Sequence, residues 1–163
     1  MTRITELTET AADALVSVLA GLGHVDAIPA AEWAESVAEV ERLGRLADAA
    51  RVAVAAAAVS AGRSLPAAAE AIGARSGADA LAGCAGISEP EARRRIALAD
   101  ALTPGSSMTG AATPERFEML AASVREGLIG LEAALTIVRE LDAVRIRATA
   151  DDLVAAELGL VTL

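Results

Sequence analysis

Residues 29–61 read PAAEWAESVAEVERLGRLADAARVAVAAAAVSA, and this stretch decides the fold. Pro29 suits the first turn of a helix, and Glu32 and Glu35 complement the positive end of the helix dipole. Trp33 and Val37 begin a series of apolar residues at alternating steps of three and four, which is typical of a coiled-coil-like helix. The sequence predicts one helix, on the order of 45–50 Å long, that either runs through a bundle or joins a partner chain. Its predicted apolar seam continues through Val40, Leu43, Ala47, Ala50, Val54, Ala57 and Ala61.

The composition of the whole chain also favours helices. Hydrophobic residues make up 54% of the 163 residues, but aromatic residues only 1%, namely Trp33 and Phe117. Alanine supplies about a quarter of the chain, and it has the best helix propensity and little bulk. The β-branched and aromatic alternation that marks strands is missing. We therefore expect an all-α fold, in a chain long enough to bury roughly two thirds of its unfolded surface.

Glycine and proline divide the chain into two predicted parts. A first helix is expected over 5–20, before Gly21, and residues 62–77 are expected to form a hinge or loop with at most a short helix over 66–71. Residues 1–62 would then form an N-terminal helix plus the long coiled-coil-like helix. Residues 78–163 would form a bundle of short helical hairpins of the helix–turn–helix kind, although one continuous domain is the alternative.

The second part shows repeated start and stop signals. Its predicted helices cover 78–85, the stretch from the Ser88 cap to about 102, 113–126 with Thr113 as cap, 130–143 and 149–158. Gly86 and Gly127 end helices in two segments of similar pattern, which suggests two hairpins of similar build. The last four residues, 160–163, form a mostly apolar ending without a cap, so they read as an element cut short.

Charge and targeting signals restrict the partners and the cellular compartment that are expected for the chain. The net charge is −9, all 14 basic residues are arginine, and an acidic chain binds nucleic acid only through a local basic patch. The single Cys84 permits no intramolecular disulfide, which fits a reducing cytoplasm. Residues 1–10 contain no apolar run typical of a secretory signal. The most apolar stretch, 52–61, is about half the length of a membrane span. These features predict a cytoplasmic protein without a membrane partner.

Residues that perform chemistry are scarce. His24 is the only histidine and lies in a predicted loop, so neither a zinc cluster nor a histidine-based triad is expected. Walker and dinucleotide-binding glycine patterns are absent. Cys84 is interpreted as a small core residue, and Asp151 and Asp152 as charges at a helix start. The sequence predicts no catalytic residue, no metal and no cofactor.

One segment carries a positive signal for DNA binding. Ala82, Gly86 and Ile96 roughly fit the small residue, turn glycine and apolar anchor of a DNA-binding helix–turn–helix. The second helix of this segment then offers three candidate contacts to DNA phosphates, Arg93, Arg94 and Arg95. Glu89, Pro90 and Glu91 stand at its start, however, where base-reading side chains usually lie. The alternative is a helical hairpin whose arginines pair with the acidic first arm, which contains Glu32, Glu35, Glu39, Glu41 and Asp48.

The same segment resembles a known family. The runs 75–82, 86–88 and 91–102 are similar to those of actinobacterial HNH-endonuclease-signature proteins, which have a helical N-terminal domain of unknown function. The resemblance covers about residues 39–158. It implies a nuclease module with metal-binding histidines and an asparagine at the C-terminal end of such proteins. This chain stops before such a module, so no family catalytic residue has a counterpart here.

Two functional hypotheses follow, neither of them enzymatic. The first is an accessory helical domain of an HNH-nuclease-type protein that contacts DNA phosphates through Arg93, Arg94 and Arg95. The alternative is a protein–protein interaction or homo-oligomerisation module that associates through its long helix and binds no nucleic acid. A remnant of a broken gene, with no function left, is a third reading.

Overall fold

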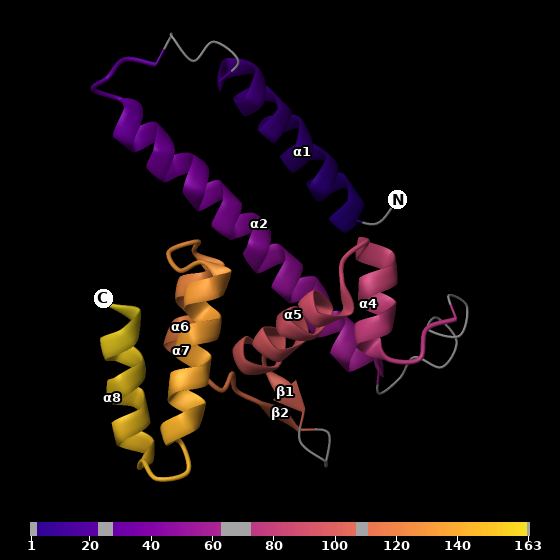
Figure 1. The fold of residues 1–163 in the computed structure, drawn as a ribbon, viewed down its shortest axis with the longest axis vertical. Coiled ribbons are helices and arrows are strands. Elements are labelled where there is room, and N and C mark those ends of the chain that lie inside the picture. Colours follow the sequence, from indigo (N-terminus) through magenta and orange to yellow (C-terminus); the bar gives the residue numbers. More distant parts are fainter. Residues whose placement is uncertain (1–2, 23–27, 63–72, 107–110, 163) are drawn as a thin grey trace. The chain divides into compact units, whose positions relative to one another are not determined.

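A computed structural model describes residues 3–22, 28–62, 73–106 and 111–162. The predicted all-α class is confirmed, because seven helices form the described part of the chain, with one short antiparallel pair of two-residue strands (Figure 1). The elements are α1 Arg3–Leu22, α2 Trp33–Gly62, α4 Gly77–Ala85, α5 Glu89–Leu102, β1 Gly105–Ser106, β2 Ala112–Thr113, α6 Glu118–Arg125, α7 Leu131–Val144 and α8 Ala150–Val161.

The chain divides into two compact units, Met1–Val40 and Glu41–Leu163. The division falls within α2, whereas the sequence placed it in the segment 62–77. The reason is that the second half of α2 belongs to the core of the larger unit, where Val52 and Ala55 are buried. The predicted short helix over 66–71 lies outside the described residues.

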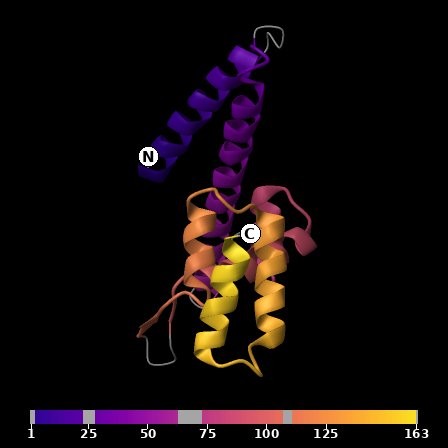
Figure 2. The same cartoon turned by 90° about the vertical axis from the view of Figure 1, so that its left-hand side faces the viewer.

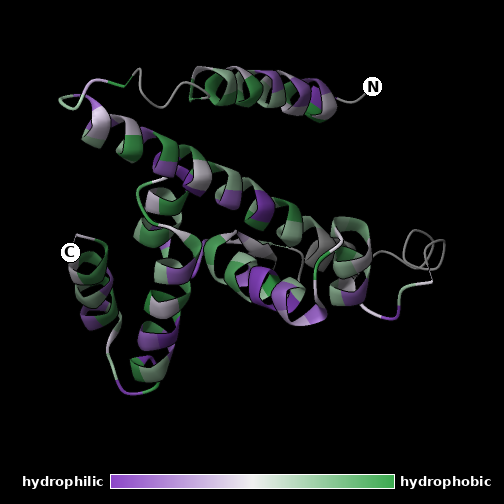
Figure 3. Cartoon of the chain, turned by 45° about the horizontal axis from the view of Figure 1, so that its top comes forward, coloured by the Kyte–Doolittle hydropathy of each residue, from purple (hydrophilic) through white to green (hydrophobic). Residues whose placement is uncertain are grey.

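In the first unit, α1 extends two residues beyond the predicted helix at each end. Its sequence is amphipathic, but none of its residues is buried. Figure 3 shows hydrophobic and hydrophilic residues interspersed along this helix. Its large apolar side chains are therefore accessible to solvent, including Ile4, Leu7, Leu15, Val16, Val18 and Leu19.

The second unit contains the hydrophobic core. α6, α7 and α8 pack on one another, and α5 packs against α4, α6 and α7 (Figures 1 and 2). Alanines at the contacts of α5 allow neighbouring helices to approach closely. Leucines fill the space between the helices. The fully buried side chains include Ala92, Leu98, Ala99, Ala101, Leu120 and Ala134.

The predicted seam of α2 is not the side that the core of the second unit buries. Val52 and Ala55 are buried, with Ala49 and Ala56 packed beside them, and we call these four residues the inner face of α2. The seam lies on the opposite side of the helix at about 100° per residue. Most of it is exposed, and Val54 is 61% accessible. We call the seam residues of this unit the outer face of α2: Leu43, Ala47, Ala50, Val54 and Ala57.

Local signals set most of the helix ends as predicted. Gly86 and Gly127 adopt positive φ angles of 65° and 71°, which glycine tolerates without steric cost, and each ends the first helix of a hairpin. The Ser88 side chain accepts the Glu91 amide, and Thr149 forms a capping box with Asp152. Hydrogen bonds from the Thr149 hydroxyl and amide hold the pKa of Asp152 below its ordinary value of 3.8.

The predicted helix start at Thr113 is wrong. Thr113 lies in β2, and α6 begins at Glu118, after the buried Phe117. Phe117 has no capping side chain, and the amide of Leu120 donates instead to the Glu157 carboxylate at 2.8 Å. The cap of α6 is therefore supplied from α8, which no local pattern reveals.

Candidate functional site

The candidate DNA contacts lie on α5, the second helix of the α4–α5 hairpin. Ser88 caps α5, and Ala92, Leu98 and Ala99 anchor its inner side in the core. The three arginines are consecutive, so about 100° separates each from the next around the helix. They consequently differ in accessibility: the side chain of Arg93 is 70% exposed and that of Arg95 only 15%.

Each of these arginines lies beside a carboxylate. Arg93 Nη2 is 2.6 Å from Glu89 Oε1, and Arg95 Nε is 2.8 Å from Glu91 Oε1, in both cases one helical turn earlier. Arg94 pairs with Glu132 of α7 and lies 3.7 Å from Glu91. The expected partners in the acidic first arm were therefore wrong, because glutamates of the first turn of α5 and of α7 are nearer. A phosphate would have to compete with these carboxylates.

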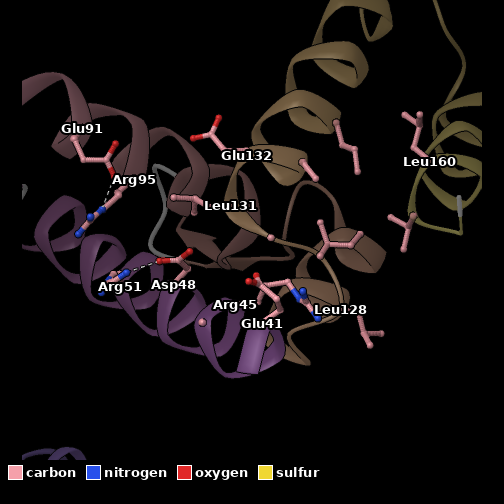
Figure 4. Close-up of a pocket in the computed structure, with 16 residues that line it drawn as sticks. Glu41, Arg45, Asp48, Arg51, Glu91, Arg95, Leu128, Leu131, Glu132 and Leu160 are labelled. Carbon is pink, nitrogen blue, oxygen red and sulfur yellow. Dashed lines mark hydrogen bonds and ion pairs between the residues drawn. The ribbon is translucent and has the colours of Figure 1, made fainter. Parts of the chain in front are cut away.

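A groove of about 860 Å³ lies beside α5 within the second unit. Its walls come from the second half of α2, from α5, from the α6–α7 turn, from α7 and from the end of α8. Figure 4 shows charged side chains of α2 and α5 at one side of it and Leu160 at the other. The charged residues that line it include Arg45, Asp48, Arg51, Glu91 and Arg95.

The arginines that line this groove form ion pairs or hydrogen bonds with other groups of the protein. Arg51 Nη1 lies 2.6 Å from Asp48 Oδ1, and Arg95 is held by Glu91. Arg45 Nε donates to the carbonyl oxygen of Gly127 at 2.6 Å, which ties the α6–α7 turn to α2. Of these three contacts, the bond from Arg45 joins two walls of the groove, whereas the other two lie within α2 and within α5. We assign the groove a structural role. The link from Arg45 to Gly127 joins residues 82 positions apart, and sequence reasoning missed it because it has no local signal.

The remaining candidates for chemistry give no assembled site. Cys84 was interpreted as a core residue, but it is exposed, because α4 turns Leu81 toward the core instead. Asp151 and Asp152 occupy the first turn of α8, as interpreted. Within the described ranges, no group of three or more His, Cys, Asp or Glu residues is placed to hold a metal ion. His24 lies outside the described residues.

Among the helices that the structure describes, none combines the length and the apolar character needed to cross a membrane.

Comparison with known proteins gives no match to any protein-family model, to any curated protein or to any solved structure.

Proposed function

We propose that this chain is a non-catalytic helical module that associates with a second copy of itself through the outer face of α2. The observation that carries the proposal is the two-sided apolar character of that helix. Its inner face is buried in the core of the second unit, whereas its outer face repeats apolar residues at steps of four and three, and most of them are exposed.

Side-chain size on this outer face also suits helix pairing. Ala47, Ala50 and Ala57 have little bulk, so a partner helix can approach closely, and Leu43 and Val54 provide larger side chains to pack into it. A soluble chain that leaves such a stripe accessible presents a surface of the kind found at protein interfaces.

Size-exclusion chromatography with light scattering tests the proposal. The mass of the wild-type chain is expected to rise with concentration from that of the monomer toward a multiple of it. Val54→Glu places a charge on the outer face and is expected to keep the chain monomeric. The matched control is Ala53→Glu, which adds the same charge at the neighbouring exposed position and should associate like the wild type. A monomer at all concentrations, or unchanged association of Val54→Glu, contradicts the proposal.

DNA-phosphate contact is the second candidate function, and the accessibility of Arg93 is the observation that favours it. Its side chain is 70% exposed and that of Arg94 is 47% exposed, so both guanidinium groups reach solvent. The ion pairs to Glu89, Glu91 and Glu132, together with the net charge of −9, weigh against strong binding.

Fluorescence anisotropy with duplex DNA at low salt separates the two candidates. We expect no measurable affinity from an association module. If DNA binds, and the variant Arg93→Ala with Arg94→Ala loses that binding while Arg139→Ala keeps it, the DNA candidate replaces our proposal. Arg139 is the matched control because it is an exposed arginine of α7 that pairs with its own neighbour, Glu140.

A place beside an HNH nuclease module rests only on the resemblance of about residues 39–158 to that family. It stays a prediction about context, and sequencing the coding region downstream of this chain checks it.

A further inference from the structure

Within the second unit, α2 contacts the other helices at its inner face and again about two turns before Val52. The inner face is held by burial, since Val52 and Ala55 are both buried. None of residues 41–51 is buried, so the earlier turns of α2 lack that support. Helical turns without tertiary contacts open readily in water. The second contact therefore matters for keeping these turns in place.

This second contact is made with the α6–α7 turn. Arg45 Nε donates to the carbonyl oxygen of Gly127 at 2.6 Å, and the bond is part-buried. Gly127 has no Cβ, and an added one would lie 2.9 Å from Leu46 Cγ and 3.3 Å from the carbonyl oxygen of Arg42. The turn thus lies directly against residues 42–46 of α2, and a charge-assisted hydrogen bond fixes it there. We call the Arg45–Gly127 contact the Arg45 tie.

The Arg45 tie lies beside the first residues of the outer face but is not part of it. Leu43 and Ala47 are each two positions from Arg45, so about 160° separates either side chain from that of Arg45 around the helix. A second copy on the outer face would therefore cover Leu43 and Ala47 but not Arg45. An effect of Arg45 on association would have to act through the position of α2.

We propose that Arg45 is a positioning residue for the association surface, because its tie holds the turns that carry Leu43 and Ala47 against the second unit. The inference rests on the self-association proposed above and deepens it. If these turns opened, Leu43 and Ala47 would have to be ordered each time a second copy binds, and that ordering lowers the affinity. The tie keeps the first half of the outer face arranged before association.

Arg45→Met tests the inference, because methionine keeps an unbranched side chain but cannot donate to the Gly127 carbonyl oxygen. In light scattering of the full chain over a range of concentrations, the dissociation constant of the associated form should rise about tenfold. Gly127→Ala displaces Leu46 and should weaken association similarly, from the other side of the contact.

Two matched controls separate positioning from general stability. Arg139→Met removes an exposed arginine of α7, and it should associate like the wild type. Gly86→Ala introduces the same backbone strain as Gly127→Ala, but a Cβ there meets no atom within 4 Å. It should lower the folding stability and leave association unchanged. Circular dichroism checks that each variant retains its helices.

Hydrogen exchange on the monomer provides a measurement that does not depend on association. The amides of residues 43–47 should exchange about tenfold or more faster in Arg45→Met than in the wild type, and at the wild-type rate in Arg139→Met. Faster exchange there, together with weaker association, is the result that we expect.

Three results would overturn the inference: association of Arg45→Met like the wild type, equal weakening by Gly86→Ala and Gly127→Ala, and unchanged exchange of residues 43–47. All three leave the proposed self-association intact, since that is decided by the mass of the wild type and of Val54→Glu. A wild-type chain that is monomeric at every concentration contradicts the self-association instead, and faster exchange in Arg45→Met would then still show that the tie holds these turns.

Discussion

Gly127 shows how one residue joins a local turn to a distant helix. Its φ angle of 71° favours glycine, and a Cβ atom there would lie 2.9 Å from Leu46 Cγ of α2. We expect Gly127→Ala to lower the free energy of unfolding by about 2–5 kcal/mol, from backbone strain and overlap together. Urea denaturation measures this loss.

Gly86 is the matched control for that substitution. Its φ angle is 65°, but no atom lies within 4 Å of the position of a Cβ. Gly86→Ala should therefore cost only the backbone strain, about 1–2 kcal/mol. An equal loss of unfolding free energy in the two variants would mean that a Cβ atom at position 127 does not overlap sterically with Leu46.

Glu157 is the buried carboxylate of the second unit, only 6% accessible, and it accepts the amide of Leu120. Glu157→Ala leaves that buried N–H without its acceptor and should cost about 2–3 kcal/mol in the free energy of unfolding. Glu157→Gln keeps an acceptor oxygen but loses the charge at the start of α6, so about 1 kcal/mol is expected.

The control for Glu157 is Glu140→Ala, at an exposed position of α7, with an expected change within about 0.5 kcal/mol. Thermal or urea unfolding measures the free energy of unfolding of the three variants and so ranks them. If Glu157→Ala is as mild as Glu140→Ala, the cap contributes nothing to stability.

At the scale of the element, α2 offers a test of which side faces the core. Val52 is 4% accessible and Val54 is 61% accessible, two residues apart in one helix. Val52→Ala should cost about 1–3 kcal/mol through lost burial and an unfilled cavity. Val54→Ala should change the free energy of unfolding by no more than about 0.5 kcal/mol in the monomer.

These two variants have the same chemistry, so helix propensity cancels in the comparison. A larger loss for Val54→Ala, measured by urea denaturation at a concentration where the chain is monomeric, would reverse our assignment of the inner and outer faces.

At the scale of the whole molecule, the two units should differ in local stability. α1 buries no residue, whereas α6 and α7 supply several fully buried side chains. A helix without buried contacts is marginal in water. We expect amides of α1 to open with a free energy of ~0–2 kcal/mol, and those of α7 to approach the global free energy of unfolding. Hydrogen exchange on the monomer measures both, and protection of α1 equal to that of α7 would contradict the expectation.

The sequence by itself determined the features that depend on near neighbours. The helical class, the long helix, the Ser88 and Thr149 caps and the turns at Gly86 and Gly127 all follow from residues within one or two turns of each other, because capping and backbone conformation are local.

The tertiary structure alone decided the features that join distant residues. Packing determines which side of α2 is buried, and it places Glu132 beside Arg94. The start of α6 lies at Glu118 and not at the predicted Thr113, and the Glu157 carboxylate accepts the amide of Leu120 in its first turn. The physical reason is that alanine occurs on every side of these helices. An apolar spacing therefore indicates where a helix lies but not which of its sides is buried, and that choice depends on packing against residues far away in the chain.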